Sequence, residues 1–265
     1  MSGPLIASIG HGAMARALGA SLARHAQGPQ LGGALLREAP VTPLPAEFRI
    51  WTRVQDLIAA RPDLVVECAT HQAVDETVPE LLAAGIDVAI VSVGALARPG
   101  LAEKIEAAAR AGRSRAIVVS GAIGGLDVLG AAKHAGLDRV TYVGRKPPAA
   151  WKGTPAEQIL DLDRLTEATI FYEGSATEAA RDYPKNTNVT AAVALAGVGF
   201  AQTRVRLIAD PDAPGNIHEL EASGAFGSFR ITLTNKPLPE NPKTSWLAAL
   251  SVEQAVLRHF SFLEI

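Results

Sequence analysis

The histidine at position 218 is the residue of this chain best suited to transfer protons. It begins a predicted β-strand beside Glu219 and Glu221, and an imidazole titrates near the pH at which most enzymes work. Successive strand residues point to opposite faces, so we expect His218 and Glu219 to lie on opposite sides of the sheet. On spacing alone, a surface histidine at a strand edge is the more ordinary interpretation.

A second group of polar residues, from Lys185 to Asn188, directly precedes the apolar stretch 189–198. Asn188 is a good N-cap for the helix that this stretch predicts. The same lysine and asparagines also suit an anion, because an ammonium, amide donors and the positive end of a helix dipole can all meet a carboxylate. Lys185 and Asn188 are therefore candidate substrate-binding residues.

The amino-terminal part of the chain carries a glycine turn, Gly10-His11-Gly12-Ala13-Met14-Ala15. It follows a predicted strand at 5–9 and opens a predicted helix at 13–25, which is the context of a dinucleotide-binding fingerprint. The first glycine permits the tight bend, the second admits a pyrophosphate, and the helix terminus supplies N–H groups. We expect Gly10, Gly12, Ala13 and Met14 to contact NAD or NADP.

The residues after the second strand leave the choice of cofactor open. An NAD site usually has an acidic residue there for the ribose 2′-hydroxyl, whereas this chain has Arg37 followed by Glu38. Arg37 suits a 2′-phosphate, which slightly favours NADP. It also suits stacking on adenine while Glu38 binds the ribose, or it is an ordinary solvated charge. Ala69 and Ala122, after later strands, are small enough to leave room for the cofactor.

These residues must be positioned by alternating strands and helices. Predicted strands at 31–36, 63–68, 88–93 and 116–120 alternate with helices at 54–60, 73–84 and 101–111, which indicates a doubly wound parallel sheet of the Rossmann type. After residue 121 strands of alternating pattern dominate, which predicts a mainly antiparallel sheet with helices on one face. We therefore expect an α/β protein with a dinucleotide-binding domain, residues 1–121, and an α+β catalytic and dimerisation domain, residues 122–243. A carboxyl-terminal helix within 244–265 would return to the first domain.

Composition excludes several other classes. The 265 residues are 48% hydrophobic and 20% charged, and 25 basic against 27 acidic residues give a net charge of −2. No basic cluster suits nucleic acid, and the most apolar stretch, 190–201, is too short to span a membrane. The single cysteine, Cys68, excludes an intramolecular disulfide and a Cys-rich zinc site, so we predict no metal and a cytoplasmic location.

The sequence resembles the L-aspartate dehydrogenase family. The most specific matches are Pro184-Lys185-Asn186 and the segment 241–245, because a generic dinucleotide fold does not require them. Further matching segments span most of the chain: residues 10–15, 92–96, 120–127, 183–189, 222–227 and 235–245. The resemblance implies that His218 is the catalytic residue, that Ala122 and Asn188 contact the cofactor, and that the protein is a homodimer.

The resemblance also implies a reaction, the NAD(P)-dependent oxidation of L-aspartate to iminosuccinate. This product hydrolyses to oxaloacetate and ammonia or feeds NAD biosynthesis first. His218 would accept a proton from the substrate amine or activate the water that attacks the imine. Two alternatives stay open: a reductase of another amino or keto acid, similar to dihydrodipicolinate reductase, and a non-catalytic sensor of NAD(P) on the same fold.

Overall fold

The computed structural model describes residues 3–25, 27–38, 44–238 and 241–263. The chain forms two compact units, one of residues Met1–Val119 with Ala249–Ile265 and the other of residues Ser120–Ala248. Each unit has its own hydrophobic core, so each is described by itself.

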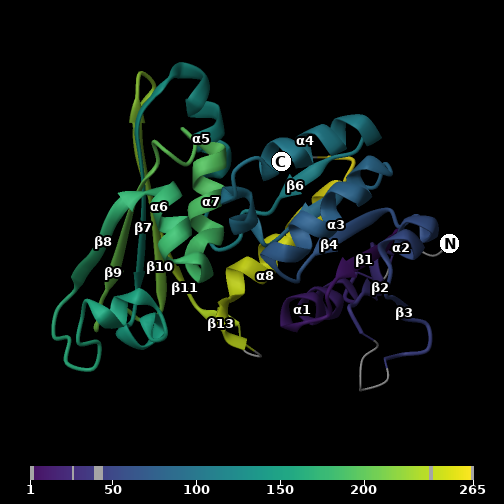
Figure 1. Ribbon diagram of the computed structural model, residues 1–265, viewed down its shortest axis with the longest axis horizontal. Helices are drawn as coiled ribbons and strands as arrows, with labels where there is room; N and C mark the ends of the chain where they lie inside the picture. The colour runs from purple at the N-terminus through teal and green to yellow at the C-terminus, as the bar shows by residue number, and fades with distance from the viewer. Residues whose placement is uncertain (1–2, 26, 39–43, 239–240, 264–265) are drawn as a thin grey trace. The chain divides into compact units, whose positions relative to one another are not determined.

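The described part of the first unit contains a six-stranded parallel sheet with the order β3-β2-β1-β4-β5-β6 (Figure 1). This order, in which the chain runs outward in both directions from β1, is that of a Rossmann fold and confirms the predicted fold class. The strands are β1 (Leu5–Ile9), β2 (Gln30–Leu35), β3 (Arg49–Trp51), β4 (Leu64–Glu67), β5 (Val88–Ile90) and β6 (Ala116–Val118).

Helices connect these strands and cover the sheet. They are α1 (Ala13–Leu22), α2 (Val54–Ala60), α3 (His71–Ala83), α4 (Leu101–Gly112) and α8 (Trp246–His259), with a 3-10 turn at Val93–Ala97. One face of the sheet packs against α1 and α8, where Leu18 and Val252 are fully buried or nearly so against Ile6 and Val66. Every residue of β4 is buried, and this burial on both faces of the sheet explains why its sequence is nearly continuously apolar.

A buried carboxylate fixes the carboxyl edge of this sheet. Glu67, the last residue of β4, is fully buried and accepts hydrogen bonds from the backbone N–H of Ala69 at 2.7 Å and of Ser92 at 2.8 Å. The Ser92 hydroxyl donates a third bond at 3.0 Å. Burial raises the pKa of Glu67, and these three donors oppose that rise. Glu67 thereby ties together the turns that follow β4 and β5.

The second unit has a five-stranded mixed sheet with the order β11-β10-β7-β9-β8. Only the β7–β9 pairing is parallel among these strands, so the sheet is mainly antiparallel, as predicted. The strands are β7 (Leu137–Lys146), β8 (Thr169–Ser175), β9 (Arg204–Ala209), β10 (Asn216–Gly224) and β11 (Gly227–Asn235).

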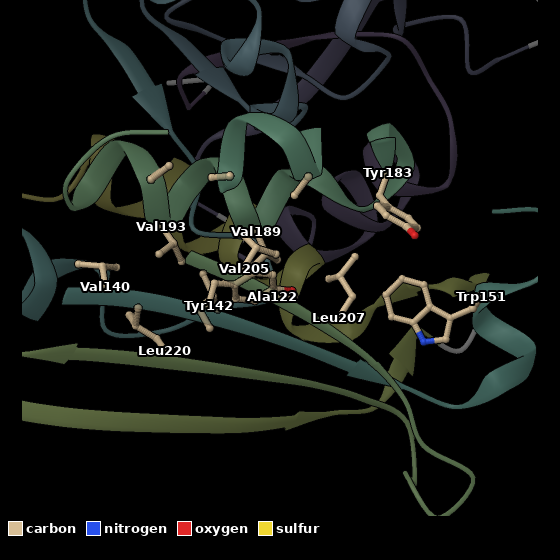
Figure 2. Packing of buried hydrophobic residues seen from close by; sticks show 14 of the residues in the cluster. Ala122, Val140, Tyr142, Trp151, Tyr183, Val189, Val193, Val205, Leu207 and Leu220 are labelled. Carbon is tan, nitrogen blue, oxygen red and sulfur yellow. The ribbon is translucent and has the colours of Figure 1, made fainter. Parts of the chain in front are cut away.

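Helices α5 (Leu126–Ala132), α6 (Ala176–Asp182) and α7 (Thr187–Ala196) cover one face of this sheet (Figure 1). Between sheet and helices lies a core in which Tyr142 and Leu220 from the strands meet Val189 and Val193 from α7, with Trp151 at one end (Figure 2). Short 3-10 turns complete the unit, at Lys133–Ala135, Pro148–Trp151, Pro155–Gln158 and Pro184–Asn186.

Three local features differ from the sequence pattern or were not predicted from it. Pro237–Leu238 (β12) pairs with Asn241–Ser245 (β13). The last helix begins at Trp246 rather than at 244, since residues 244 and 245 belong to β13. The first unit also has the short strand β3, Arg49–Trp51, which has no alternating or sustained apolar pattern to reveal it.

Candidate functional site

The glycine turn between β1 and α1 opens onto a pocket of about 500 Å³. The pocket lies at the carboxyl edge of the parallel sheet, where doubly wound folds bind their ligands. Its lining includes three of the residues predicted to bind the cofactor, Gly10, Arg37 and Ala69.

The two glycines of the turn have different roles. Gly10 has a φ of +81°, and a Cβ added there would lie 3.0 Å from the Cβ of Ala69. Gly12 has an ordinary φ of −77°, and no atom lies within 4 Å of the position of a Cβ. The backbone conformation therefore requires a glycine at position 10, whereas the glycine at position 12 leaves the space beside the turn free of a side chain.

The amino terminus of α1 lacks a side-chain cap. Gly12 occupies the N-cap position and makes no side-chain hydrogen bond, so no side chain at that position caps the first turn, which includes Ala13 and Met14. The Nδ1 atom of His11, inside the turn, is buried without a partner among the described residues. Uncapped helix N–H groups beside an open space fit a bound phosphate, as a dinucleotide would supply.

Charges of both signs lie near the end of β2. Arg37 is exposed and donates to Gln72 Oε1 at 3.2 Å, and Gln72 in turn donates to Glu76 at 2.6 Å. Arg37 and Glu76 both line the pocket. A guanidinium attracts a 2′-phosphate whereas a carboxylate favours a 2′-hydroxyl, so the two side chains favour different cofactors.

In the second unit, His218 lies near the start of β10 and is 5% exposed. Its Nδ1 is 2.8 Å from the Tyr142 hydroxyl, and the two rings are stacked with their centroids 6.0 Å apart. Glu219 points to the other face of the sheet, where Arg230 donates to its carboxylate at 2.7 Å. The predicted opposition of His218 and Glu219 thus agrees with the pairing of the strands.

A glycine makes room for the contact between His218 and Tyr142. Gly144 is directly opposite His218 in the β7–β10 pairing, and Tyr142 lies two residues earlier on the same face. A Cβ at Gly144 would lie 2.9 Å from the Tyr142 hydroxyl oxygen. A side chain at position 144 would therefore push the phenol away from the imidazole.

Lys146 follows on the same face of β7 and completes what we call the His218 cluster, formed by Tyr142, Lys146, Trp151, Asn186 and His218. The Lys146 ammonium donates to Asn186 Oδ1 and lies 4.9 Å from the centre of the Trp151 ring. Trp151 is fully buried and is fixed by its own hydrogen bond to the Ile208 carbonyl at 3.1 Å.

Burial changes the protonation of this cluster. The pKa of His218 falls to about 3, mainly because its site is poorly hydrated and secondarily because of the positive charge of Lys146. Burial also lowers the pKa of the Lys146 ammonium to about 8 and raises the pKa of the Tyr142 hydroxyl. At neutral pH, His218 is an uncharged imidazole beside a protonated phenol and a charged lysine.

The structure places the remaining predicted residues as follows. Ala122 is buried, and its carbonyl accepts a hydrogen bond from the Asn235 amide at 2.9 Å. Asn188 is exposed on α7. The backbone of Lys185 lies in the 3-10 turn Pro184–Asn186, and its side chain lies outside the described residues.

The expectation that Asn188 caps its helix is wrong. Helix α7 begins at Thr187, and Asn186 occupies the N-cap position without making a side-chain cap. The Asn186 amide oxygen instead accepts from Lys146, and the Thr187 hydroxyl donates to the carbonyl of Pro184. The 3-10 turn thus moves the helix start earlier than the apolar pattern indicates.

Sequence analysis missed Tyr142, Lys146 and Trp151 as members of the site. Strand β7 extends beyond Gly144 to Lys146. The alternation of positions 142, 144 and 146 along one strand face was the available signal. Among the described residues, no helix could span a membrane and no group of three His, Cys, Asp or Glu side chains could hold a metal.

Comparison with known proteins decides the family. Residues 127–259 match the family described as "Aspartate dehydrogenase, C-terminal", and residues 10–119 match "Homoserine dehydrogenase, NAD binding domain". The L-aspartate dehydrogenase of Cupriavidus necator is 54% identical over 216 residues, which cover 82% of this chain and 80% of the relative. The chain belongs to the L-aspartate dehydrogenase family.

Other relatives agree over nearly the full length. The L-aspartate dehydrogenase of Serratia proteamaculans is 45% identical over 256 residues, 96% of each chain. The crystal structure of aspartate dehydrogenase from Thermotoga maritima has a TM-score of 0.78 at 27% identity and covers 99% of both chains. These matches confirm the resemblance stated from the sequence motifs.

Substitutions of the two glycines of the turn test its contributions to stability and to cofactor binding separately. Gly10→Ala forces a side chain into a left-handed conformation and should lower the unfolding free energy by about 1–2 kcal/mol without any ligand. Gly12→Ala should change it by less than about 0.5 kcal/mol, since its φ is ordinary and its surroundings are open. The methyl group that Gly12→Ala adds would occupy the open space, so affinity for NADH or NADPH should fall at least about tenfold.

Urea unfolding and fluorescence titration with NADH and NADPH measure the two effects. Unchanged cofactor affinity in a folded Gly12→Ala protein would show that the cofactor does not approach this turn.

Proposed function

We propose that this protein is an NAD(P)-dependent L-aspartate dehydrogenase, which oxidises L-aspartate to iminosuccinate that then hydrolyses to oxaloacetate and ammonia. The observation that carries the proposal is a buried His218 held by Tyr142 on the sheet face that also carries Lys146, in a chain of this family. An uncharged imidazole can accept a proton, and a charged ammonium can attract a dicarboxylate.

The residues of the glycine turn are proposed to hold the cofactor. The backbone of Gly10, Gly12, Ala13 and Met14 would receive the pyrophosphate at the uncapped terminus of α1, with Ala69 lining the same region. The family resemblance adds Ala122 and Asn188 as contacts, and Arg37 would bind the adenosine end. When bound, the nicotinamide accepts the hydride that leaves the α-carbon of L-aspartate.

His218 is the proposed catalytic base. The α-ammonium of L-aspartate must lose a proton before the carbon–nitrogen double bond forms, and His218 is uncharged and able to take it. Tyr142 holds Nδ1, so Nε2 is the nitrogen left for this transfer. Once it has released that proton to solvent, the same nitrogen could activate the water that attacks the imine. Lys185 and Asn188, near the start of α7, are proposed to bind the substrate.

Replacement of His218 tests the assignment of the base. We expect the wild-type protein to reduce NAD or NADP with L-aspartate and not with D-aspartate or L-glutamate. In His218→Ala, kcat should fall by about 100-fold or more, because general base catalysis contributes roughly 10²–10⁴, while the affinity for NADH should stay within about threefold. Initial rates of NADH or NADPH formation and a fluorescence titration provide both numbers.

The same assay separates the alternative functions. Tight cofactor binding with no turnover of L-aspartate would favour a sensor or a reductase of another substrate over the proposed enzyme. Full activity of a folded His218→Ala protein would support the proposed reaction but show that His218 is not its catalytic base.

Arg37 provides a separate prediction on cofactor choice. If its guanidinium meets a 2′-phosphate, Arg37→Leu should lower kcat/KM for NADP at least about tenfold, the loss of one charge-assisted contact of ~1.5 kcal/mol or more. The value for NAD should change less than about threefold. Glu38→Gln serves as the control, since it would lower the value for NAD if Glu38 binds the ribose. An equal loss with both cofactors in Arg37→Leu would place the guanidinium on the adenine.

We further propose a homodimer in the cytoplasm, whose iminosuccinate is available to pyridine nucleotide biosynthesis before it hydrolyses. The family resemblance and the single cysteine support these statements. The helices α5, α6 and α7 cover only one face of the second sheet (Figure 1), and the unit exposes apolar side chains such as Ile170, 50% exposed. Sedimentation equilibrium should give twice the chain mass of 27.6 kDa, and a single chain mass would contradict the dimer.

A further inference from the structure

We propose that Lys146 is the counter-ion for a carboxylate of the substrate, a role that rests on the proposed oxidation of L-aspartate. Sequence analysis assigned carboxylate recognition to Lys185 and Asn188. The geometry points to a further group for one of the two carboxylates, the lysine at the end of β7, which shares a sheet face with His218.

The surroundings of Lys146 are those of a cation that lacks an anion. Its ammonium contacts the neutral oxygen of Asn186 and the face of the Trp151 ring. Among the residues whose side chains are described, no carboxylate forms an ion pair with it. A poorly hydrated charge without a partner is costly, so such a group in a folded protein calls for a ligand of opposite charge.

The other lysine close by in sequence shows what an ordinary partner looks like. Lys152 lies at the surface and donates to the Asp163 carboxylate at 2.6 Å. Asp210, whose backbone N–H bonds the carbonyl of Lys146, directs its own carboxylate to Arg145 at 2.8 Å. The nearby acidic group is therefore already paired, which leaves the Lys146 charge available.

The contacts of Lys146 hold its ammonium in place without neutralising it. Trp151 is fixed by the core and by its bond to the Ile208 carbonyl, so its ring is a rigid surface for the cation. Asn186 ends the 3-10 turn before α7, and its amide oxygen fixes a second direction. An ammonium has three donors, and the Asn186 bond uses one of them. The remaining donors suit a carboxylate.

The position next to His218 relates this binding site to the chemistry. Lys146 and His218 face the same side of two paired strands, and the charge of Lys146 lowers the pKa of His218. A carboxylate bound at Lys146 would hold L-aspartate by one end while the amine reaches the imidazole. This arrangement favours a substrate with two carboxylates, because one can meet Lys146 while the other binds elsewhere.

Lys146→Met tests the proposal, because methionine keeps an unbranched stem against Trp151 and removes the charge together with the hydrogen bond to Asn186. We expect KM for L-aspartate to rise at least about tenfold, and competitive inhibition by succinate, a dicarboxylate without an amine, to weaken by a similar factor. NADH affinity should stay within about threefold. The ligand-free variant should unfold at about the same urea concentration as wild type, since removal of a poorly hydrated charge without an anion offsets the loss of the Asn186 and Trp151 contacts. Succinate should raise the melting temperature of wild type and not of the variant.

Two variants complete the design. Lys152→Met removes a charge that already has a partner, and should leave KM and succinate inhibition unchanged. Lys146→Gln keeps a hydrogen-bond donor for Asn186 without the charge, and tests the same point if the methionine variant does not fold.

The outcomes distinguish this inference from the proposed function. If wild type oxidises L-aspartate and both Lys146 variants keep KM and succinate inhibition within twofold, Lys146 is not the counter-ion although the enzyme assignment stands. If Lys185→Met alone raises KM, the carboxylate belongs to Lys185. If wild type binds succinate through Lys146 but does not oxidise L-aspartate, the anion site stands and the proposed reaction fails.

Discussion

One electrostatic constraint governs the second unit: an imidazole and an ammonium share a poorly hydrated face of the same sheet. Burial lowers the pKa of both groups, and the positive charge of Lys146 lowers the pKa of His218 further. His218 is therefore uncharged at neutral pH, and the charge stays on Lys146. Tyr142, whose pKa is raised by burial, stays protonated and binds the imidazole without adding a charge.

This arrangement depends on backbone features that carry no chemistry themselves. Gly144 removes the side chain that would separate Tyr142 from His218, and the antiparallel pairing of β7 with β10 sets the two rings side by side. In the first unit Glu67 has the corresponding role. Its three hydrogen bonds join the turns after β4 and β5, one of which includes the pocket residue Ala69. These hydrogen bonds fix the positions of the two turns more specifically than apolar packing would. If a turn moves, its donor loses its partner on the buried carboxylate.

The parts of the molecule that were predictable are those encoded in local pattern. The strands of the parallel sheet are recognisable as apolar runs, and the glycine turn follows from its position between β1 and α1. His218 was proposed as a base from its residue type and from the family resemblance, and the alternation of β10 correctly separated it from Glu219. Its environment was not predictable, since the pKa of an imidazole depends on which strands pair beside it. The role of Lys146 was not predictable for the same reason. The sequence does not distinguish Lys146 from Lys152. Tertiary packing pairs Lys152 with Asp163, whereas Lys146 has no anionic partner among the described side chains. Asn186 and Asn188 were likewise interchangeable in the sequence until the 3-10 turn fixed where α7 begins.

The low pKa of His218 has a consequence for the order of events at the site. A base with a pKa of about 3 is weak at neutral pH, which is a poor match for the proton of an ammonium group. Part of that weakness comes from the charge of Lys146, and a carboxylate that pairs with Lys146 would cancel this part. A substrate carboxylate bound at Lys146 would therefore raise the pKa of His218 in part, because it removes the smaller of the two causes that lower it, while burial remains. A substrate that places a carboxylate at Lys146 would gain both the attraction of the ammonium and this partial rise in the basicity of His218, whereas a substrate that leaves Lys146 unpaired would gain neither.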